Sequence, residues 1–198
     1  MNDSAQTRAD FAVIERSDAR WARLRALIEL HSLKRGDFTL SSGGKSTFLF
    51  QLRQTTMLPE GAKILGDVVV DFMKHHDLRC VGGLAVGAVP MVSAVSVMSF
   101  IKGFPVDAFF VRKEAKSHGA LERIDGFVRN GGEVLLIDDV ATSGNSIIKS
   151  MEGMRAEHPT SFARKALVMI DREEGARENL ARHGIELYSI FTRRDFSV

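Results

Sequence analysis

Cysteine is almost missing from this chain of 198 residues, which contains only Cys80. A single cysteine excludes an intramolecular disulfide and a cysteine-based metal cluster, and it suits a reducing compartment. Long apolar runs are missing too, because no stretch approaches the roughly 20 apolar residues that cross a bilayer. Residues 1–30 alternate charged and apolar side chains and lack the apolar segment of a signal peptide. We therefore expect a cytoplasmic protein that is not bound to a membrane.

A strong net charge is also missing. The 27 basic and 25 acidic residues leave a formal charge of +2, so there is no global electrostatic case for binding nucleic acid. A local basic cluster would still suit a phosphorylated small molecule. With 198 residues, 44% of them hydrophobic, the chain can bury one core but is too short for two ordinary enzyme domains.

Short apolar runs alternate with segments of helical periodicity through most of the chain. The expected strands are 80–84, 106–111, 134–137, 166–170 and 185–191, and the expected helices are 64–73, 90–100, 147–155 and 173–183. Because the strands are apolar on both faces, they predict a buried parallel sheet in an α/β core. Ligands bind such sheets beyond the carboxyl ends of the strands, so the site is expected there.

The N-terminal part has a different pattern. Apolar residues at three- and four-residue spacing after Asp18 predict a helix, and residues 38–40 and 47–52 flank a turn-prone segment at 41–44. We expect residues 1–60 to form a small helix-and-hairpin hood over one edge of the core. The core itself would occupy residues 61–198 of the same single domain.

The most informative stretch is Val134-Leu-Leu-Ile-Asp-Asp-Val-Ala-Thr-Ser-Gly-Asn-Ser146. An apolar strand here delivers two adjacent carboxylates, Asp138 and Asp139, to its exit. Carboxylates accept hydrogen bonds from hydroxyl groups, so the pair suits the diol of a ribose. The loop that follows has small and hydroxyl side chains and leads into a helix, and it suits a phosphate group. This loop consists of Val140, Ala141, Thr142, Ser143, Gly144, Asn145 and Ser146.

This stretch resembles the motif with which type I phosphoribosyltransferases bind PRPP (5-phosphoribosyl 1-diphosphate). Phe110-Val-Arg-Lys-Glu-Ala-Lys-Ser-His-Gly119 resembles the flexible loop of one family within that group, the orotate phosphoribosyltransferases. Four further segments resemble the same family in the same order. They are the base-binding hairpin at 38–51, the pyrophosphate loop at 81–90, the strand end at 171–174 and the closing segment at 191–196.

The resemblance implies a type I phosphoribosyltransferase fold and transfer of the phosphoribosyl group of PRPP to orotate, yielding orotidine 5'-monophosphate and pyrophosphate. It also implies Mg²⁺ as cofactor, with no firm protein ligand except Asp138 or Asp139 through water, and a homodimer with shared active sites. The implied catalytic residues are Lys116, His118, Asp138 and Asp139. The implied PRPP ligands are these four with Arg112, Lys113 and residues 140–146, and Val86, Gly87 and Ala88 of the pyrophosphate loop. The implied orotate ligands are Lys45, Phe50, Thr142 and Arg172, and the peptide at Ala85–Val86 is expected to be cis.

Three positions depart from the common family pattern. Ser41 and Gly87 stand where many members have lysine, and Leu49 stands where many have the first of two aromatic residues beside the base. Lys45 is a candidate replacement for one lysine. At the other position, glycine would offer a bare backbone N–H to pyrophosphate.

Three other functions are compatible with parts of this sequence. Gly43-Gly-Lys-Ser46 resembles the end of a P-loop, but Thr39 stands where that motif needs glycine and the next residues favour a strand. A PRPP-binding regulator of nucleic acid would reuse the fold without the cationic loop. A phosphoribosyltransferase for another base is disfavoured by the hairpin and by Arg172. We therefore predict an orotate phosphoribosyltransferase.

Overall fold

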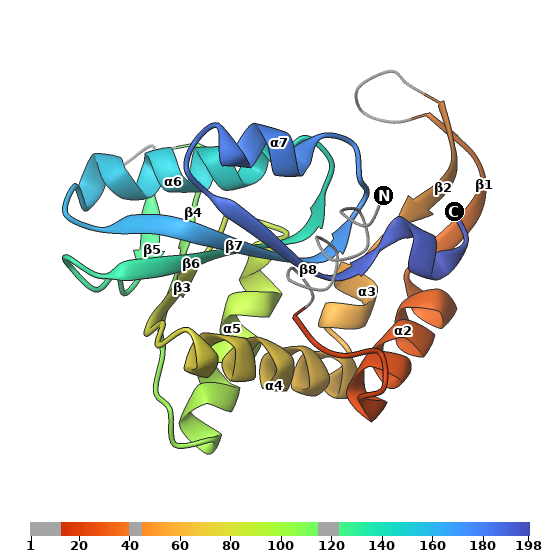
Figure 1. Cartoon of the computed structure of the whole chain (residues 1–198), viewed down its shortest axis with the longest axis horizontal. Helices are drawn as coiled ribbons and strands as arrows, with labels where there is room; N and C mark the ends of the chain where they lie inside the picture. The colour runs from red at the N-terminus through yellow and green to blue at the C-terminus, as the bar shows by residue number, and fades with distance from the viewer. Residues whose placement is uncertain (1–12, 40–44, 115–122) are drawn as a thin grey trace, which may run out of the picture.

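The computed structural model describes residues 13–39, 45–114 and 123–198 and is built on one six-stranded sheet (Figure 1). The strand order is β5-β4-β3-β6-β7-β8, and all neighbours are parallel except the antiparallel edge strand β5. The strands are β3 (Cys80–Gly82), β4 (Asp107–Val111), β5 (Ile124–Gly126), β6 (Glu133–Ala141), β7 (Phe162–Asp171) and β8 (Glu186–Thr192). The predicted α/β core with a parallel sheet is therefore confirmed.

Helices cover both faces of this sheet. They are α2 (Ala19–His31), α3 (Arg53–Thr56), α4 (Pro59–His75), α5 (Ala88–Ile101), α6 (Asn145–Glu157) and α7 (Ala176–Ala181), and the 3-10 helix η1 (Arg193–Phe196) follows β8. Figure 1 shows α4 and α5 on one face and α6 and α7 on the other. None of the helices in the described ranges is long and apolar enough to span a membrane.

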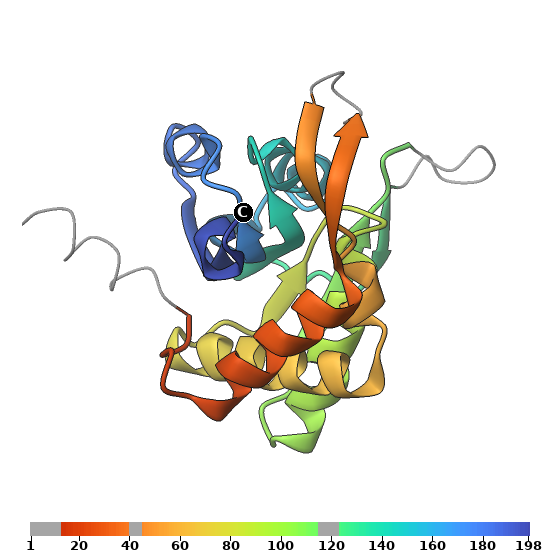
Figure 2. The same ribbon diagram turned by 90° about the vertical axis from the view of Figure 1, so that its right-hand side faces the viewer.

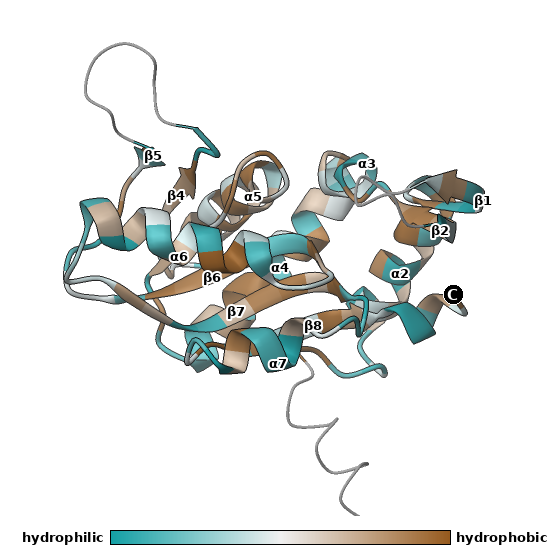
Figure 3. Cartoon of the chain, turned by 90° about the horizontal axis from the view of Figure 1, so that it is seen from above, coloured by the Kyte–Doolittle hydropathy of each residue, from teal (hydrophilic) through white to brown (hydrophobic). Residues whose placement is uncertain are grey.

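The apolar run of β6 explains why the sheet lies in the middle. Leu135 and Ile137 belong to the apolar cluster under α4 and α5, whereas Val134 and Leu136 belong to the cluster under α6. Successive strand residues point to opposite faces, so a run without polar residues is buried on both. In Figure 3 the strands of the sheet are mostly coloured as hydrophobic, whereas the helices carry both hydrophobic and hydrophilic residues.

The predicted hood is a helix followed by a hairpin. The Asp18 side chain accepts a hydrogen bond from the backbone N–H of Arg20 and so caps α2. The chain then runs into β1 (Leu33–Thr39), which pairs antiparallel with β2 (Lys45–Phe50) in a separate two-stranded sheet (Figure 2). Lys45 and Ser46 thus begin a strand, where a P-loop would begin a helix. The turn at 40–44, which includes Ser41, lies outside the described residues.

The helix predicted at 173–183 begins three residues later than expected. Glu173 and Gly175 have φ angles of 56° and 93°, which the right-handed helix cannot accommodate. The predicted strand at 47–52 also ends early, because Leu52 already caps the short helix α3. The elements α3, β5 and η1 were not predicted.

Candidate active site

The acidic pair lies at the carboxyl end of β6, as predicted. Asp138 is 8% exposed, and one of its carboxylate oxygens accepts a hydrogen bond from the Asp139 backbone N–H at 2.9 Å. The Asp139 carboxylate accepts one from the Val140 N–H at 2.9 Å. Burial, reinforced by the charge of Asp139, raises the pKa of Asp138 well above its ordinary value. Burial also raises the pKa of Asp139, against the lowering effect of the nearby Arg53 guanidinium. Two buried carboxyl groups in contact therefore favour partners that donate hydrogen bonds or carry positive charge.

The predicted pyrophosphate loop borders this pair directly. A Cβ atom at Gly87 would lie 2.9 Å from an Asp138 carboxylate oxygen and 3.0 Å from an Asp139 oxygen, so only glycine fits without displacement. The loop is anchored to the neighbouring strand, because the Ala85 N–H donates to the Val111 carbonyl at 2.8 Å. The peptide between Ala85 and Val86 is cis, as predicted.

The predicted phosphate loop connects β6 to α6. Gly144 has a φ of 78°, and a Cβ atom there would lie 2.9 Å from the Leu180 side chain. Within the part of the chain that the structure describes, no side chain caps the start of α6, so the first N–H groups of that helix are open to an anion. The Asn179 amide supports the loop from α7 by donating to the Ser143 carbonyl at 2.7 Å. Thr142 and Ser143 are exposed, as a ligand-binding loop requires.

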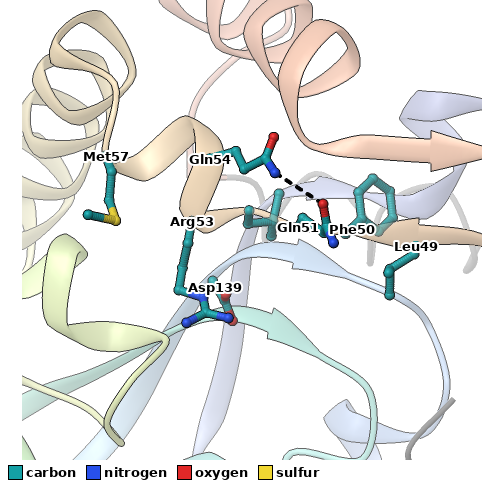
Figure 4. Close-up of a pocket in the computed structure, with 8 residues that line it drawn as sticks. Leu49, Phe50, Gln51, Arg53, Gln54, Met57 and Asp139 are labelled. Atoms are coloured by element: carbon teal, nitrogen blue, oxygen red, sulfur yellow. Dashed lines mark hydrogen bonds between the residues drawn. The ribbon is translucent and has the colours of Figure 1, made fainter.

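The hairpin and the sheet end enclose two hollows. The first has a volume of about 600 Å³ and lies between β2, α3 and the acidic pair (Figure 4). Its lining residues are Leu49, Phe50, Gln51, Leu52, Arg53, Gln54, Met57 and Asp139. The predicted base-stacking residue Phe50 therefore lies in the hollow that contains Asp139. It also contacts Phe48 and Phe196 edge-to-face, at 5.6 and 5.3 Å between ring centroids.

The second hollow has a volume of about 780 Å³ and contains Arg172, which is 8% exposed. The Arg172 guanidinium lies over the Phe48 ring at 4.8 Å and pairs with the Glu174 carboxylate at 2.9 Å. Its Nε is buried and has no hydrogen-bond acceptor among the described residues. Lys45 lines the same hollow, so two of the four predicted orotate ligands are brought together, whereas Phe50 is not among its lining residues. An arginine that is held in a fixed orientation and has an unused N–H donor is suited to bind a planar anion.

Comparisons with known proteins decide the family. An orotate phosphoribosyltransferase from Bradyrhizobium sp. (strain BTAi1) is 41% identical over 181 residues, which cover 88% of this chain and 96% of the relative. One from Aquifex aeolicus is 37% identical over 85% of this chain and 93% of the relative. The chain belongs to the orotate phosphoribosyltransferase family. It is thus a pentosyltransferase of pyrimidine biosynthesis, as predicted.

Solved structures support the same assignment. Mycobacterium tuberculosis orotate phosphoribosyltransferase, solved with Fe(III) dicitrate, is 30% identical over 90% of this chain and 99% of its own, with a TM-score of 0.79. The same enzyme solved with PRPP is 25% identical and has a TM-score of 0.70, covering 91% of this chain and 93% of its own. No family model matches the sequence.

In this orotate phosphoribosyltransferase the predicted cationic loop is only partly described. Arg112 follows β4 and is paired with Asp125 of β5, and Lys113 is exposed beside it. Lys116 and His118 lie outside the described residues.

Phe48 and Arg53 are among the residues of the hollows that the sequence analysis missed. Phe48 lies under Arg172, and Arg53 faces Asp139 from the unpredicted helix α3. The only sequence signal for Arg53 was a lone arginine directly after the expected hairpin strand.

Proposed function

We propose that the two hollows and the sheet end bind orotate and PRPP side by side, and that positioning and electrostatics perform the transfer. The observation that carries this proposal is the meeting of three features at one point. The acidic pair, the glycine of the pyrophosphate loop and the uncapped start of α6 all follow strand ends of the same sheet.

Asp138 and Asp139 would accept hydrogen bonds from the two ribose hydroxyls, and residues 140–146 would hold the 5-phosphate. Val86, Gly87 and Ala88 would present backbone N–H groups to pyrophosphate. Orotate N1 would attack C1 of the ribose as the bond to pyrophosphate breaks on the opposite face, and the N1 proton would pass to the departing pyrophosphate. Positive charge that develops at C1 would then lie close to the two carboxylates, which stabilise it.

The side chains at the sheet end could supply only part of the coordination shell of Mg²⁺. Within the described ranges no three histidine, cysteine or acidic side chains cluster into a metal cage, so the protein alone offers the two adjacent carboxylates. A hydrated Mg²⁺ keeps several waters and takes substrate oxygens, so Asp138 or Asp139 would hold it through water. When bound, the ion would neutralise charge on the pyrophosphate oxygens.

Orotate would occupy the second hollow. The Arg172 fork would pair with the orotate carboxylate, with Lys45 as a second cation, and Thr142 would donate a hydrogen bond to the base. Phe50 would cover the base at the border with the first hollow, since β2 lines both. The unused Nε of Arg172 supports this assignment, because buried donors normally have an acceptor.

A panel of bases tests the reaction. Orotate, uracil, adenine and hypoxanthine are each mixed with PRPP and Mg²⁺, and pyrophosphate release is followed. Release with orotate alone, lost when EDTA replaces Mg²⁺, is expected. Binding of PRPP without release for any base would favour a regulator, and release with another base would reassign the substrate.

The cationic loop would serve a partner subunit in a homodimer. Arg112, Lys113, Lys116 and His118 would neutralise the leaving group across the interface. Mixing inactive Lys116→Ala protein with inactive Asp138→Asn protein should restore activity, because a mixed dimer combines one intact pocket with the other chain's intact loop. If subunit exchange is demonstrated and activity stays absent, the loop serves its own pocket.

The remaining parts of the proposal concern organisation and location. Residues 1–60 would act as a hood on the core at 61–198, because Leu24, Ile28 and Phe48 share one apolar cluster with α4. The single, buried Cys80 suits a cytoplasmic location.

A further inference from the structure

Arg53 lines the first hollow, but the proposed binding of orotate and PRPP gives it no role. It is the one cationic side chain among that hollow's lining residues in the described part of the chain. Figure 4 shows its guanidinium reaching from α3 toward the Asp139 carboxylate. A cation at this place faces the space beside the acidic pair, where PRPP would bind.

The backbone that carries Arg53 is firmly held. Thr55, two residues further along α3, is buried, and its hydroxyl is hydrogen-bonded to the Ser32 hydroxyl at 2.7 Å. A Cβ atom at Gly61 would lie 2.2 Å from the Thr55 carbonyl oxygen, so α3 packs closely against the start of α4. Leu52 is buried as well, whereas Arg53 is exposed. The helix is therefore a fixed support that presents Arg53 to the hollow.

The Arg53 guanidinium is not committed to a protein partner. Across residues 13–39, 45–114 and 123–198 it forms no ion pair or side-chain hydrogen bond, whereas nearby Arg23 is held by Glu60 at 2.7 and 2.6 Å. An exposed guanidinium in a fixed place with free N–H donors is suited to bind an anionic ligand.

The position favours diphosphate as that anion. Gly87 approaches the same Asp139 carboxylate from the pyrophosphate loop at the start of α5, and α3 packs against α5. The carboxylate of orotate already has Arg172 in the other hollow. Glycine at position 87 brings no charge of its own, and Arg53 is the cationic side chain that lines the hollow on this side.

We propose that Arg53 is a substrate-binding residue that contacts a diphosphate oxygen of PRPP and of the product pyrophosphate. This inference rests on the proposed placement of PRPP beside the acidic pair. It adds a fixed cation from the hood to the cations of the loop at 112–118.

The test compares Arg53→Gln and Arg53→Lys with Arg164→Gln as the matched control. Arg164 is an exposed arginine that pairs with Glu133 near the amino end of β6, away from both hollows. The measurements are the KM for PRPP, the KM for orotate and the inhibition constant of inorganic pyrophosphate. Circular dichroism and thermal melting check the fold.

Arg53→Gln should raise the KM for PRPP and the inhibition constant of pyrophosphate about tenfold or more, the effect of losing a charge-assisted hydrogen bond. The KM for orotate should change little, Arg53→Lys should recover part of the loss, and Arg164→Gln should resemble the wild type. Unchanged pyrophosphate inhibition in Arg53→Gln would overturn the inference, as would a selective rise in the KM for orotate. An inactive wild type would instead refute the proposed function.

Discussion

Replacement of Arg172 by alanine tests the base pocket most directly. The fork can donate two hydrogen bonds to the orotate carboxylate, and each hydrogen bond to a charged group contributes about 1.5–3 kcal/mol. Losing both corresponds to about 3–6 kcal/mol, or roughly a hundredfold to ten-thousandfold in kcat/KM for orotate. The KM for PRPP should change far less, because Arg172 lies in the hollow that does not contain Asp139.

The same substitution should leave the protein folded. It removes the contact of Arg172 with Phe48, worth about 2 kcal/mol at a desolvated site, and the pair with the more exposed Glu174, worth about 1 kcal/mol or less. Both are small beside the roughly 5–15 kcal/mol that stabilise a typical domain. Thermal melting with and without substrates measures this directly.

Two further variants separate the contribution of the planar Arg172 guanidinium from that of its partner Glu174. Arg172→Lys retains the charge but loses the planar fork, so it should recover only part of the activity with orotate. Glu174→Gln removes the partner of Arg172 and keeps the guanidinium, so it should stay active. The reasoning fails if Arg172→Ala weakens orotate and PRPP equally, or if Glu174→Gln is as damaging as Arg172→Ala.

Three other perturbations have definite expected outcomes. Asp138→Asn should abolish most turnover. The same substitution should raise the melting temperature of the ligand-free protein at neutral pH. The pKa of Asp138 is raised in the folded protein, so its negative charge at neutral pH destabilises the fold, and asparagine removes that charge. That gain should vanish below about pH 4, the ordinary pKa of aspartate; a gain independent of pH would contradict it. Gly87→Ala should impair PRPP binding more than folding, because the added Cβ would lie 2.9 and 3.0 Å from the Asp138 and Asp139 carboxylate oxygens. An unchanged KM for PRPP would show that the two carboxylates move aside. Cys80, 1% exposed and with a pKa raised by burial, should react with a thiol reagent only after denaturation.

The sequence was sufficient to predict the parallel strands of the sheet and the position of the acidic pair at the end of one of them. Residues 134–146 combine an unbroken apolar strand, two acids and a loop of small residues, and each part has a local cause that a sequence displays. Tertiary packing was needed to bring Gly87 against the pair.

The hood was harder to predict from sequence. The register of β1 and β2 shifts between Arg35 and Phe38, and such an irregularity decides which side chains face the sheet end. Phe48 lies under Arg172, while Phe50, two positions further along the same strand, is in the other hollow. The helix α3 has four residues, too few for a periodic pattern. Arg53 could therefore be recognised only from its position in three dimensions.

One strand forms a wall of both hollows, and this would link the two substrates that we propose to bind there. Residues 45–48 of β2 line the hollow of Arg172, and residues 49–50 line that of Asp139. A change in side chain near the start of β2 can alter base preference alone. A one-residue insertion or deletion within the strand would invert the direction of every later side chain and disturb both pockets together. We therefore expect base selectivity to be adjustable by substitutions at 45–48, whereas the length of β2 must stay constant for either substrate to bind.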